Sequence, residues 1–172
     1  MDKESRFKEI IEANRDRIFR ICCSYVRDPD ERKDVFQEII VNVWKSLDTF
    51  RAESQVTTWV YRVVVNTCLT HLRTEKRRLK HYDSEASTNI DLIPQEEQDE
   101  RQEETHRSIE HMFRCINRLS PIDRALVALY LEDVSSRESA EILGISEVNI
   151  RVKLHRIRKE LKRLMKEHAY GT

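Results

Sequence analysis

The chain has 172 residues, 36% of them charged, with only two glycines and three prolines. Proteins built of β-sheets need glycine and proline for their many turns, so this composition indicates an all-α fold and argues against a sheet protein. The length allows one large domain or two small ones, and an apolar fraction of 39% favours small helical bundles over one thick core.

No apolar run is long enough to span a membrane, and the first ten residues lack the apolar segment of a signal peptide. We therefore expect a cytoplasmic protein without membrane insertion. Its four cysteines form no CxxC pair, and in a reducing compartment we expect them to be small buried apolar residues: Cys22, Cys23, Cys68 and Cys115.

The net charge of zero conceals three segments of different charge. Residues 1–82 have 17 basic and 13 acidic side chains, residues 83–104 have one and nine, and residues 105–172 have 13 and nine. Two mildly basic segments therefore flank an acidic one. We interpret them as an N-terminal helical domain, a flexible linker and a C-terminal helical domain with these boundaries.

Three helices are predicted in residues 1–82. Apolar residues recur at helical spacing from Phe7 to Tyr25. The sequence DPDE at residues 28–31 then supplies an Asp cap, a proline at the first helical position and an acid at the third. The helix that follows has an apolar face wide enough for both a core and a partner, and it extends through Leu47.

Residues 51–73 allow two interpretations. Their β-branched and aromatic residues favour a strand, whereas Trp59, Val63, Thr67 and His71 recur every four residues, as in a helix. We predict a helix, because no second strand is available to pair with this segment. Its end, RTEKRRLK at residues 73–80, is strongly basic.

Four helices are predicted after the linker, and the last two have the capping and turn residues of a helix-turn-helix. Ser120 and Ser135 are placed as caps of the second and third helices, Gly144 suits the left-handed turn that follows, and Ser146 caps the fourth. The second helix of such a unit enters the major groove of DNA. Its candidate DNA-contacting residues are Asn149, Arg151, Val152, Lys153, His155 and Arg156. The alternative is a solvated amphipathic helix without a ligand.

Two segments resemble parts of a known family. The sequence LSPIDRALVALYLEDVSSRESAEILGISEVNIRVKLHRIRKEL resembles region 4 of bacterial sigma-70 factors, and DPDERKDVFQEIIVNVWKSLDTFRAESQVTTWVYRVVVNTCLTHLR resembles region 2. Their order, the linker between them and the absence of a region 3 are similar to the extracytoplasmic-function (group 4) sigma factors. The resemblance implies an initiation factor that directs core RNA polymerase to promoters.

The resemblance also implies roles for individual residues. The family's D-x-x-Q-E helix docks on the β′ clamp of the polymerase, and its counterparts here are Asp34, Gln37, Glu38, Val41, Trp44 and Leu47. We expect one of Trp44 and Leu47 to be an ordinary core residue. The counterparts of the residues that recognise and open the −10 element are Arg51, Ser54, Trp59, Tyr61, Arg62, Asn66 and Arg73. Asn66 matches the family's base-pocket asparagine, whereas Trp59 could equally belong to the core.

The implied partners are core RNA polymerase (the β′ clamp and β subunits), promoter DNA and an anti-sigma factor, and the free protein is expected to be a monomer. The chain departs from the family pattern at Ser136 and Ser139, which replace an aromatic and an aliphatic residue, and we expect looser packing there. Val152 stands where a small serine is frequent and suits a thymine methyl group.

The acidic linker is expected to stretch along a basic channel of the polymerase when both promoter elements are bound. In the free protein we expect it to fold back on the basic faces, so that promoter binding is weak. The alternative is an acidic spacer without such a role.

Metal, cofactor and enzyme interpretations find little support. Cys68 with His71, and His111 with Cys115, share helix faces, but no four-ligand zinc spacing is present. No phosphate loop or catalytic motif occurs, so no cofactor is expected. Two functional alternatives stay open, a free-standing helix-turn-helix regulator and a helical adaptor that binds acidic proteins.

Overall fold

A computed structural model describes residues 2–26, 28–51, 54–81, 109 and 111–169, and all of the regular structure in these ranges is helical. The all-α prediction is therefore confirmed. The acidic segment at residues 83–104 lies outside the described residues. Residues 111–117 form a helix between α3 and α5. The remaining elements are α1 (Lys3–Cys23), α2 (Pro29–Ser46), the 3₁₀ turn η1 (Leu47–Thr49), α3 (Val56–His81), α5 (Pro121–Leu131), α6 (Ser136–Leu143) and α7 (Glu147–Ala169).

The predicted caps set the beginnings of these helices. The Asp28 carboxylate accepts hydrogen bonds from the backbone N–H groups of Asp30 and Glu31 at 3.0 and 2.7 Å, and Pro29 occupies the first position of α2. Ser120 accepts from the N–H of Asp123 at 3.2 Å at the start of α5. Each cap satisfies backbone donors that have no partner within the helix.

From Val56 onward, the segment with the mixed strand and helix signal is part of α3, as the four-residue repeat predicted, whereas residues 51, 54 and 55 before it are not helical. Its β-branched residues favour a strand only weakly, because tertiary packing overrides propensity. Here Val60, Val64 and Cys68 follow one another at four-residue spacing and are fully buried. This stripe packs into the core, and no strand is needed to explain the β-branched residues.

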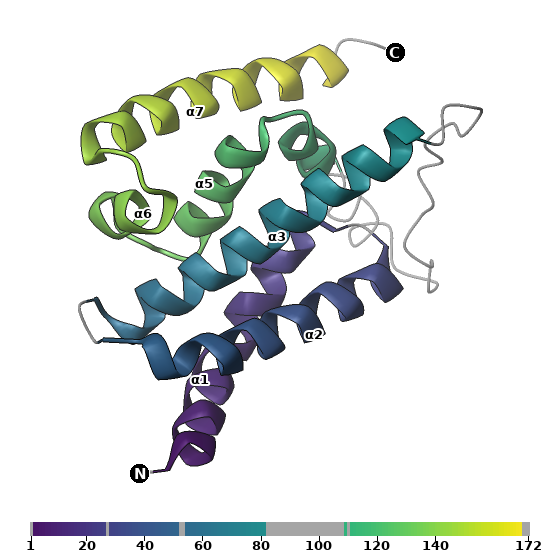
Figure 1. Cartoon of the computed structure of the whole chain (residues 1–172). Helices are drawn as coiled ribbons and strands as arrows, with labels where there is room; N and C mark the ends of the chain where they lie inside the picture. The colour runs from purple at the N-terminus through teal and green to yellow at the C-terminus, as the bar shows by residue number, and fades with distance from the viewer. Residues whose placement is uncertain (1, 27, 52–53, 82–108, 110, 170–172) are drawn as a thin grey trace, which may run out of the picture.

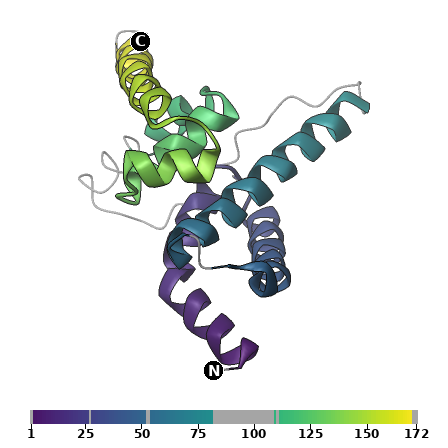
Figure 2. The ribbon, with the colours of Figure 1, turned by 60° about the vertical axis from the view of Figure 1, so that its left-hand side comes forward.

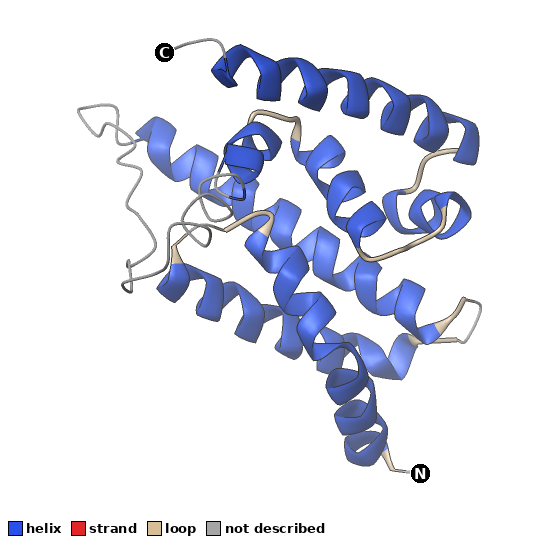
Figure 3. Cartoon of the chain, turned by 180° about the vertical axis from the view of Figure 1, so that it is seen from behind, coloured by secondary structure: helices blue, strands red, loops and turns tan. Residues whose placement is uncertain are grey.

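α3 lies at the centre of the molecule (Figure 1). It packs against α1 and α2 on one side and against α6 on the other, and α7 lies outermost, on α5 and α6. Figure 2, turned by 60°, shows α7 again on the outside, and Figure 3 shows the same helical layers from behind. We call α1–α3 the N-terminal bundle and residues 111–117 with α5–α7 the C-terminal bundle.

The two bundles share one hydrophobic cluster. This cluster is made mainly of α1, α2 and α3 side chains, but it also contains Ala125, Ala128 and Leu129 of α5 and Ile142 of α6. A second cluster, which includes Leu126, Ile150 and Ile157, lies within the C-terminal bundle. The segmentation by charge did not predict that the bundles would pack directly on each other.

The cysteines are free thiols, and Cys22, Cys68 and Cys115 are buried as expected. Cys23 differs, because it is only half-buried near the end of α1. Among the described residues, no helix is long and apolar enough to cross a membrane.

Candidate nucleic-acid interface

The turn between α6 and α7 has the backbone geometry of a helix-turn-helix. A reciprocal capping box opens α6: the Ser135 hydroxyl accepts from the N–H of Glu138 at 3.2 Å, and the Glu138 carboxylate accepts from the N–H of Ser135 at 3.0 Å. Gly144 ends α6 in the left-handed conformation at φ 67°. Ser146 then accepts from the N–H of Asn149 at 3.3 Å and starts α7. These contacts fix the direction in which α7 leaves α6.

The outer face of α7 presents most of the predicted DNA-contacting residues to solvent. Asn149, Arg151, Val152, His155 and Arg156 are exposed. On the opposite face Ile150 and Ile157 are buried against α5 and α6. The first three turns of α7 therefore combine a buried apolar face with an exposed face of polar and cationic side chains that also includes Val152.

Lys153 is the exception among the predicted residues. Its ammonium group forms an ion pair of 2.8 Å with the Asp123 carboxylate of α5 and is only partly exposed. Asp123 also accepts a hydrogen bond from the Ser120 hydroxyl at 2.7 Å. Lys153 thus ties α7 to the start of α5 within the bundle.

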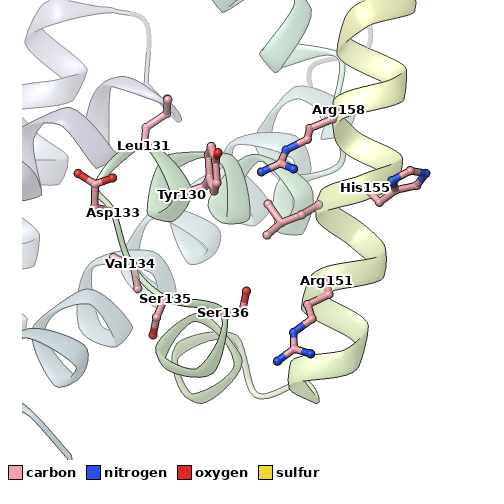
Figure 4. A pocket seen from close by; sticks show the side chains of 10 residues that line it. Tyr130, Leu131, Asp133, Val134, Ser135, Ser136, Arg151, His155 and Arg158 are labelled. Carbon is pink, nitrogen blue, oxygen red and sulfur yellow. The ribbon is translucent and has the colours of Figure 1, made fainter.

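A hollow beside α7 extends the cationic face toward the start of α6 (Figure 4). Arg158 points across this hollow, with its guanidinium 4.9 Å from the centre of the Tyr130 ring. Arg151 points toward α6 and pairs with Glu147, whereas His155 points away from the hollow. The Ser135 and Ser136 side chains at the start of α6 line the opposite wall.

The residues predicted for the −10 element lie along α3 and the loop before it. Asn66, Arg51 and Arg73 are exposed, and Ser54 is half-buried. The half-buried Trp59 lies against Phe50, with ring centres 4.9 Å apart. An aromatic platform and exposed polar groups therefore occur on neighbouring parts of this segment.

Tyr61 and Arg62 are engaged within the protein. Tyr61 is buried, and its hydroxyl accepts a hydrogen bond of 3.2 Å from Arg17 of α1. Burial raises the pKa of this hydroxyl above its ordinary value of 10.0. Arg62 donates a hydrogen bond of 2.8 Å to the backbone carbonyl of Glu141 in α6. Arg62, one of the residues predicted to contact the −10 element, is therefore hydrogen-bonded to the C-terminal bundle.

The predicted polymerase-docking residues separate into an exposed group and one core residue. Asp34, Gln37, Glu38 and Val41 are exposed on α2. Trp44 is 37% exposed and packs edge-on against Phe7, with ring centres 5.0 Å apart, whereas Leu47 is 3% exposed and belongs to the shared cluster. One of these two residues was expected to belong to the core, and that residue is Leu47.

Further polar contacts join the two bundles. Arg20 of α1 donates two hydrogen bonds to the Glu132 carboxylate at the end of α5, at 2.6 and 2.8 Å. The buried Tyr25 hydroxyl donates to the carbonyl of Pro121 at 3.2 Å. α6 lies beside α3, and the small Ser139 is buried in it. The looser packing expected at Ser136 and Ser139 stays a prediction.

Several of these residues were missed in the sequence. Arg158 follows Arg151 by seven residues and so lies on the same side of α7, and this spacing could have indicated it. Val148, in the first turn of α7, is exposed and was also missed. No local pattern in the sequence indicated that Arg20 and Glu132 would pair.

No group of three or more His, Cys, Asp and Glu side chains that could hold a metal ion comes together in the described part of the chain. Of the two pairs noted in the sequence, His111 and Cys115 are in contact, whereas His71 pairs with a residue of α2. His71 lies 3.2 Å from a carboxylate oxygen of Glu31, and the imidazole of His111 lies 3.7 Å from the Cys115 sulfur.

A capped helix-turn-helix with a cationic outer face, on one of two helical bundles, defines a DNA-binding protein of the helix-turn-helix class. Comparison with known families extends this result to the N-terminal bundle. Residues 10–78 match Sigma-70 region 2, and residues 110–161 match Sigma-70 region 4. The chain belongs to the sigma-70 family of RNA polymerase sigma factors, and its relatives assign it to the extracytoplasmic-function (ECF) group.

Curated relatives are similar over most of their length. The ECF RNA polymerase sigma factor SigW of Bacillus subtilis is 23% identical over 95% of this chain and 91% of the relative. The ECF RNA polymerase sigma-E factor of Haemophilus influenzae is 27% identical over 91% of this chain and 85% of the relative. The sequence similarity therefore spans both bundles.

Solved structures show the same fold at low sequence identity. The sigma factor RpoE, in complex with the anti-sigma factor NepR from Bartonella quintana, superimposes with a TM-score of 0.71 at 18% identity, over 95% of this chain and 96% of that one. CnrH, in complex with the cytosolic domain of CnrY, gives a TM-score of 0.65 at 18% identity, over 95% and 90% of the two chains.

Proposed function

We propose that this chain is a transcription initiation factor that gives core RNA polymerase its promoter specificity. The observation that carries the proposal is the presence of regions 2 and 4 of one family in a single chain, each with most of its predicted contact residues exposed. A free-standing helix-turn-helix regulator is less well supported, because it would leave residues 10–78 without a role. The chemistry is recognition and strand opening, whereas bond formation belongs to the polymerase.

The −35 element is the proposed ligand of α7. The exposed Asn149, Arg151 and Arg156 are the proposed contacts to base edges, with asparagine suited to adenine and arginine to guanine. The hollow between α7 and α6 suits the DNA backbone, because Arg158 and the first turn of α6 both attract phosphate. Lys153, paired with Asp123, has a structural role in this proposal.

The −10 element is the proposed ligand of α3 and of the loop before it. Bases displaced from the duplex are held by stacking on aromatic rings and by hydrogen bonds to their exposed edges. Trp59, supported by Phe50, offers a ring, and the exposed Asn66 offers an amide that both donates and accepts. Arg51 and Arg73 are exposed cations at the two ends of this surface.

The polymerase is the proposed partner of α2. Val41 and Trp44 are exposed apolar side chains beside the carboxylates of Asp34 and Glu38. Apolar anchors surrounded by acids suit a basic helical partner, as the β′ clamp would supply. We also propose an anti-sigma factor as a regulatory partner, since the structurally similar sigma factor RpoE was solved in complex with the anti-sigma factor NepR.

The bundles are proposed to separate when both promoter elements are bound. α6 packs on α3 and α7 packs on α6, at about 8–10 Å for each packed pair, so the two proposed DNA-contacting helices α3 and α7 lie within about 20 Å of each other. Promoter elements roughly twenty base pairs apart are separated by about 70 Å, at 3.4 Å per pair. The packed arrangement cannot contact both, so the free protein is expected to bind a promoter weakly.

Permanganate footprinting of promoter complexes formed with core polymerase tests the proposed division of labour. The Asn66→Ala variant should lower the reactivity of unpaired thymines at the −10 element while leaving protection of the −35 element unchanged. Arg62→Ala serves as a comparison, because its side chain must leave Glu141 before it can contact DNA. Unchanged −10 reactivity in the Asn66 variant would remove this residue from the site.

A further inference from the structure

Two valines occupy the centre of the outer face of α7. Val148 is 67% exposed, the largest exposed fraction among the large apolar side chains of the described residues, and Val152 is 43% exposed. Four residues correspond to about 400° of helical rotation, so the two side chains point in directions only about 40° apart. Their Cα atoms are separated by about 6 Å along the helix axis.

The core lies on the opposite side of the helix. Ile150, two residues from each valine, is completely buried, and Ile157 is buried one further turn along. Because two residues correspond to about 200° of rotation, the valines point almost directly away from α5 and α6. They therefore lie outside the hydrophobic cluster of the C-terminal bundle.

Helix stability does not explain the choice of valine at these two positions either. Valine loses side-chain freedom in a helix and is a poorer helix former than alanine, lysine or glutamate. Both valines nevertheless lie in the first two turns of α7, beside the exposed Asn149 and Arg151. In a helix-turn-helix, these turns are the ones whose side chains meet base edges.

We propose that Val148 and Val152 contact the 5-methyl groups of two thymines in the −35 element, an inference that rests on the proposed function. Thymine is the only base with a methyl group in the major groove, and apolar side chains distinguish it by contact with that group. The separation of about 6 Å between the valines corresponds to about two base-pair steps. The two valines thus select A·T pairs beside the positions selected by Asn149 and Arg151.

Removal of single methyl groups from the DNA tests this proposal. Promoters are first selected from a random library with the chain bound to bacterial core RNA polymerase. Each thymine of the −35 element is then replaced by deoxyuridine, which lacks only the methyl group. The wild-type complex should lose about fourfold in affinity at each of two positions, the loss expected when one buried methyl-sized group is removed. Val148→Ala should abolish this sensitivity at one position and Val152→Ala at the other.

Met165→Ala is the matched control. Met165 lies near the other end of α7 with the same exposed fraction as Val152, 43%, so its variant should keep both sensitivities. Equal affinity of the wild-type complex for thymine and deoxyuridine at every position would overturn the proposal, as would sensitivity that persists in both valine variants. Either result leaves the proposed function intact, because promoters were selected. Failure to enrich any promoter would instead contradict the proposed function.

Discussion

Arg20 and Glu132, 112 residues apart in the sequence, form a two-point ion pair that joins α1 to the end of α5. The Glu132 side chain is only 7% exposed, and the Arg17 guanidinium lies 3.9 Å from the same carboxylate. Hydrogen bonding to Glu132 raises the pKa of Arg20. Because this carboxylate comes from the C-terminal bundle and both arginines come from the N-terminal bundle, the contact depends on the packed arrangement.

Replacement of Glu132 by glutamine should loosen that arrangement, because the two arginines lose their common counter-charge. A compact chain of this length has a radius of gyration of about 16 Å. We expect small-angle scattering to give a value near this for the wild type and a larger one for the Glu132→Gln variant. Glu160→Gln, which removes only an exposed pair within α7, should behave as the wild type does. Identical scattering from all three proteins would show that Glu132 does not hold the bundles together.

Tyr25 should remain protonated in the folded protein well above its ordinary pKa. Burial raises the pKa of this hydroxyl above the usual value of 10.0, and the hydroxyl donates to Pro121 across the two bundles. The neutral form is therefore favoured by the fold, so its contribution to stability is complete below pH 10 and falls as the pH rises further.

Ultraviolet titration of tyrosinate measures this directly. The Tyr25→Phe variant should show the same reversible titration as the wild type near pH 10 and should lose one tyrosinate only from the step that accompanies unfolding. Loss of the hydrogen bond should also lower the free energy of unfolding by about 1 kcal/mol. A wild-type titration in which Tyr25 ionises at its ordinary pKa, without unfolding, would contradict this assignment.

Gly144→Ala should destabilise the turn between α6 and α7 through its backbone alone. A Cβ atom added at this position would meet no neighbour within 4 Å, whereas φ of 67° is unfavourable for alanine. We expect the free energy of unfolding to fall by about 1 kcal/mol, measured by urea denaturation. Gly144→Asn should lower the free energy of unfolding by a smaller amount, since asparagine tolerates the left-handed conformation. A larger loss for asparagine than for alanine would be inconsistent with a backbone effect.

Lys153 and Arg156 should differ in their effect on the salt dependence of promoter binding. Arg156 is exposed on α7, and its positive charge stays close to the phosphates while it contacts a base edge, so Arg156→Ala should weaken binding and reduce the slope of log affinity against log salt by up to about 1. Lys153 is paired with Asp123, so Lys153→Ala should leave that slope unchanged. The measurement is a salt titration of promoter binding by the polymerase complex, and equal slopes for the two variants would refute the distinction.

The local features of the fold were predictable because their signals are local. Asp28, Ser120, Ser135 and Gly144 act on backbone groups within a few residues, and each is found in its predicted role. The four-residue repeat in α3 also outweighed its strand-like composition. These signals depend on helical periodicity and cap chemistry, which hold for any tertiary environment.

The contacts between the bundles could not be predicted in this way. Arg20 and Glu132 are ordinary charged residues on exposed-looking helix ends, and only the folded chain brings them together. The same holds for Arg62, which the resemblance assigned to DNA and which lies against Glu141 in this arrangement. Of the predicted docking residues, burial separated Leu47 from Trp44, a distinction that depends on the neighbours of each side chain.

Run-off transcription with purified core RNA polymerase tests the central claim most directly. Two templates are compared, one with a promoter selected by the complex and one with its −35 element scrambled. We expect a transcript of defined length only when the chain, the polymerase and the intact promoter are all present. Equal transcription from both templates, or none from either, would contradict the claim that this protein directs the polymerase to its promoters.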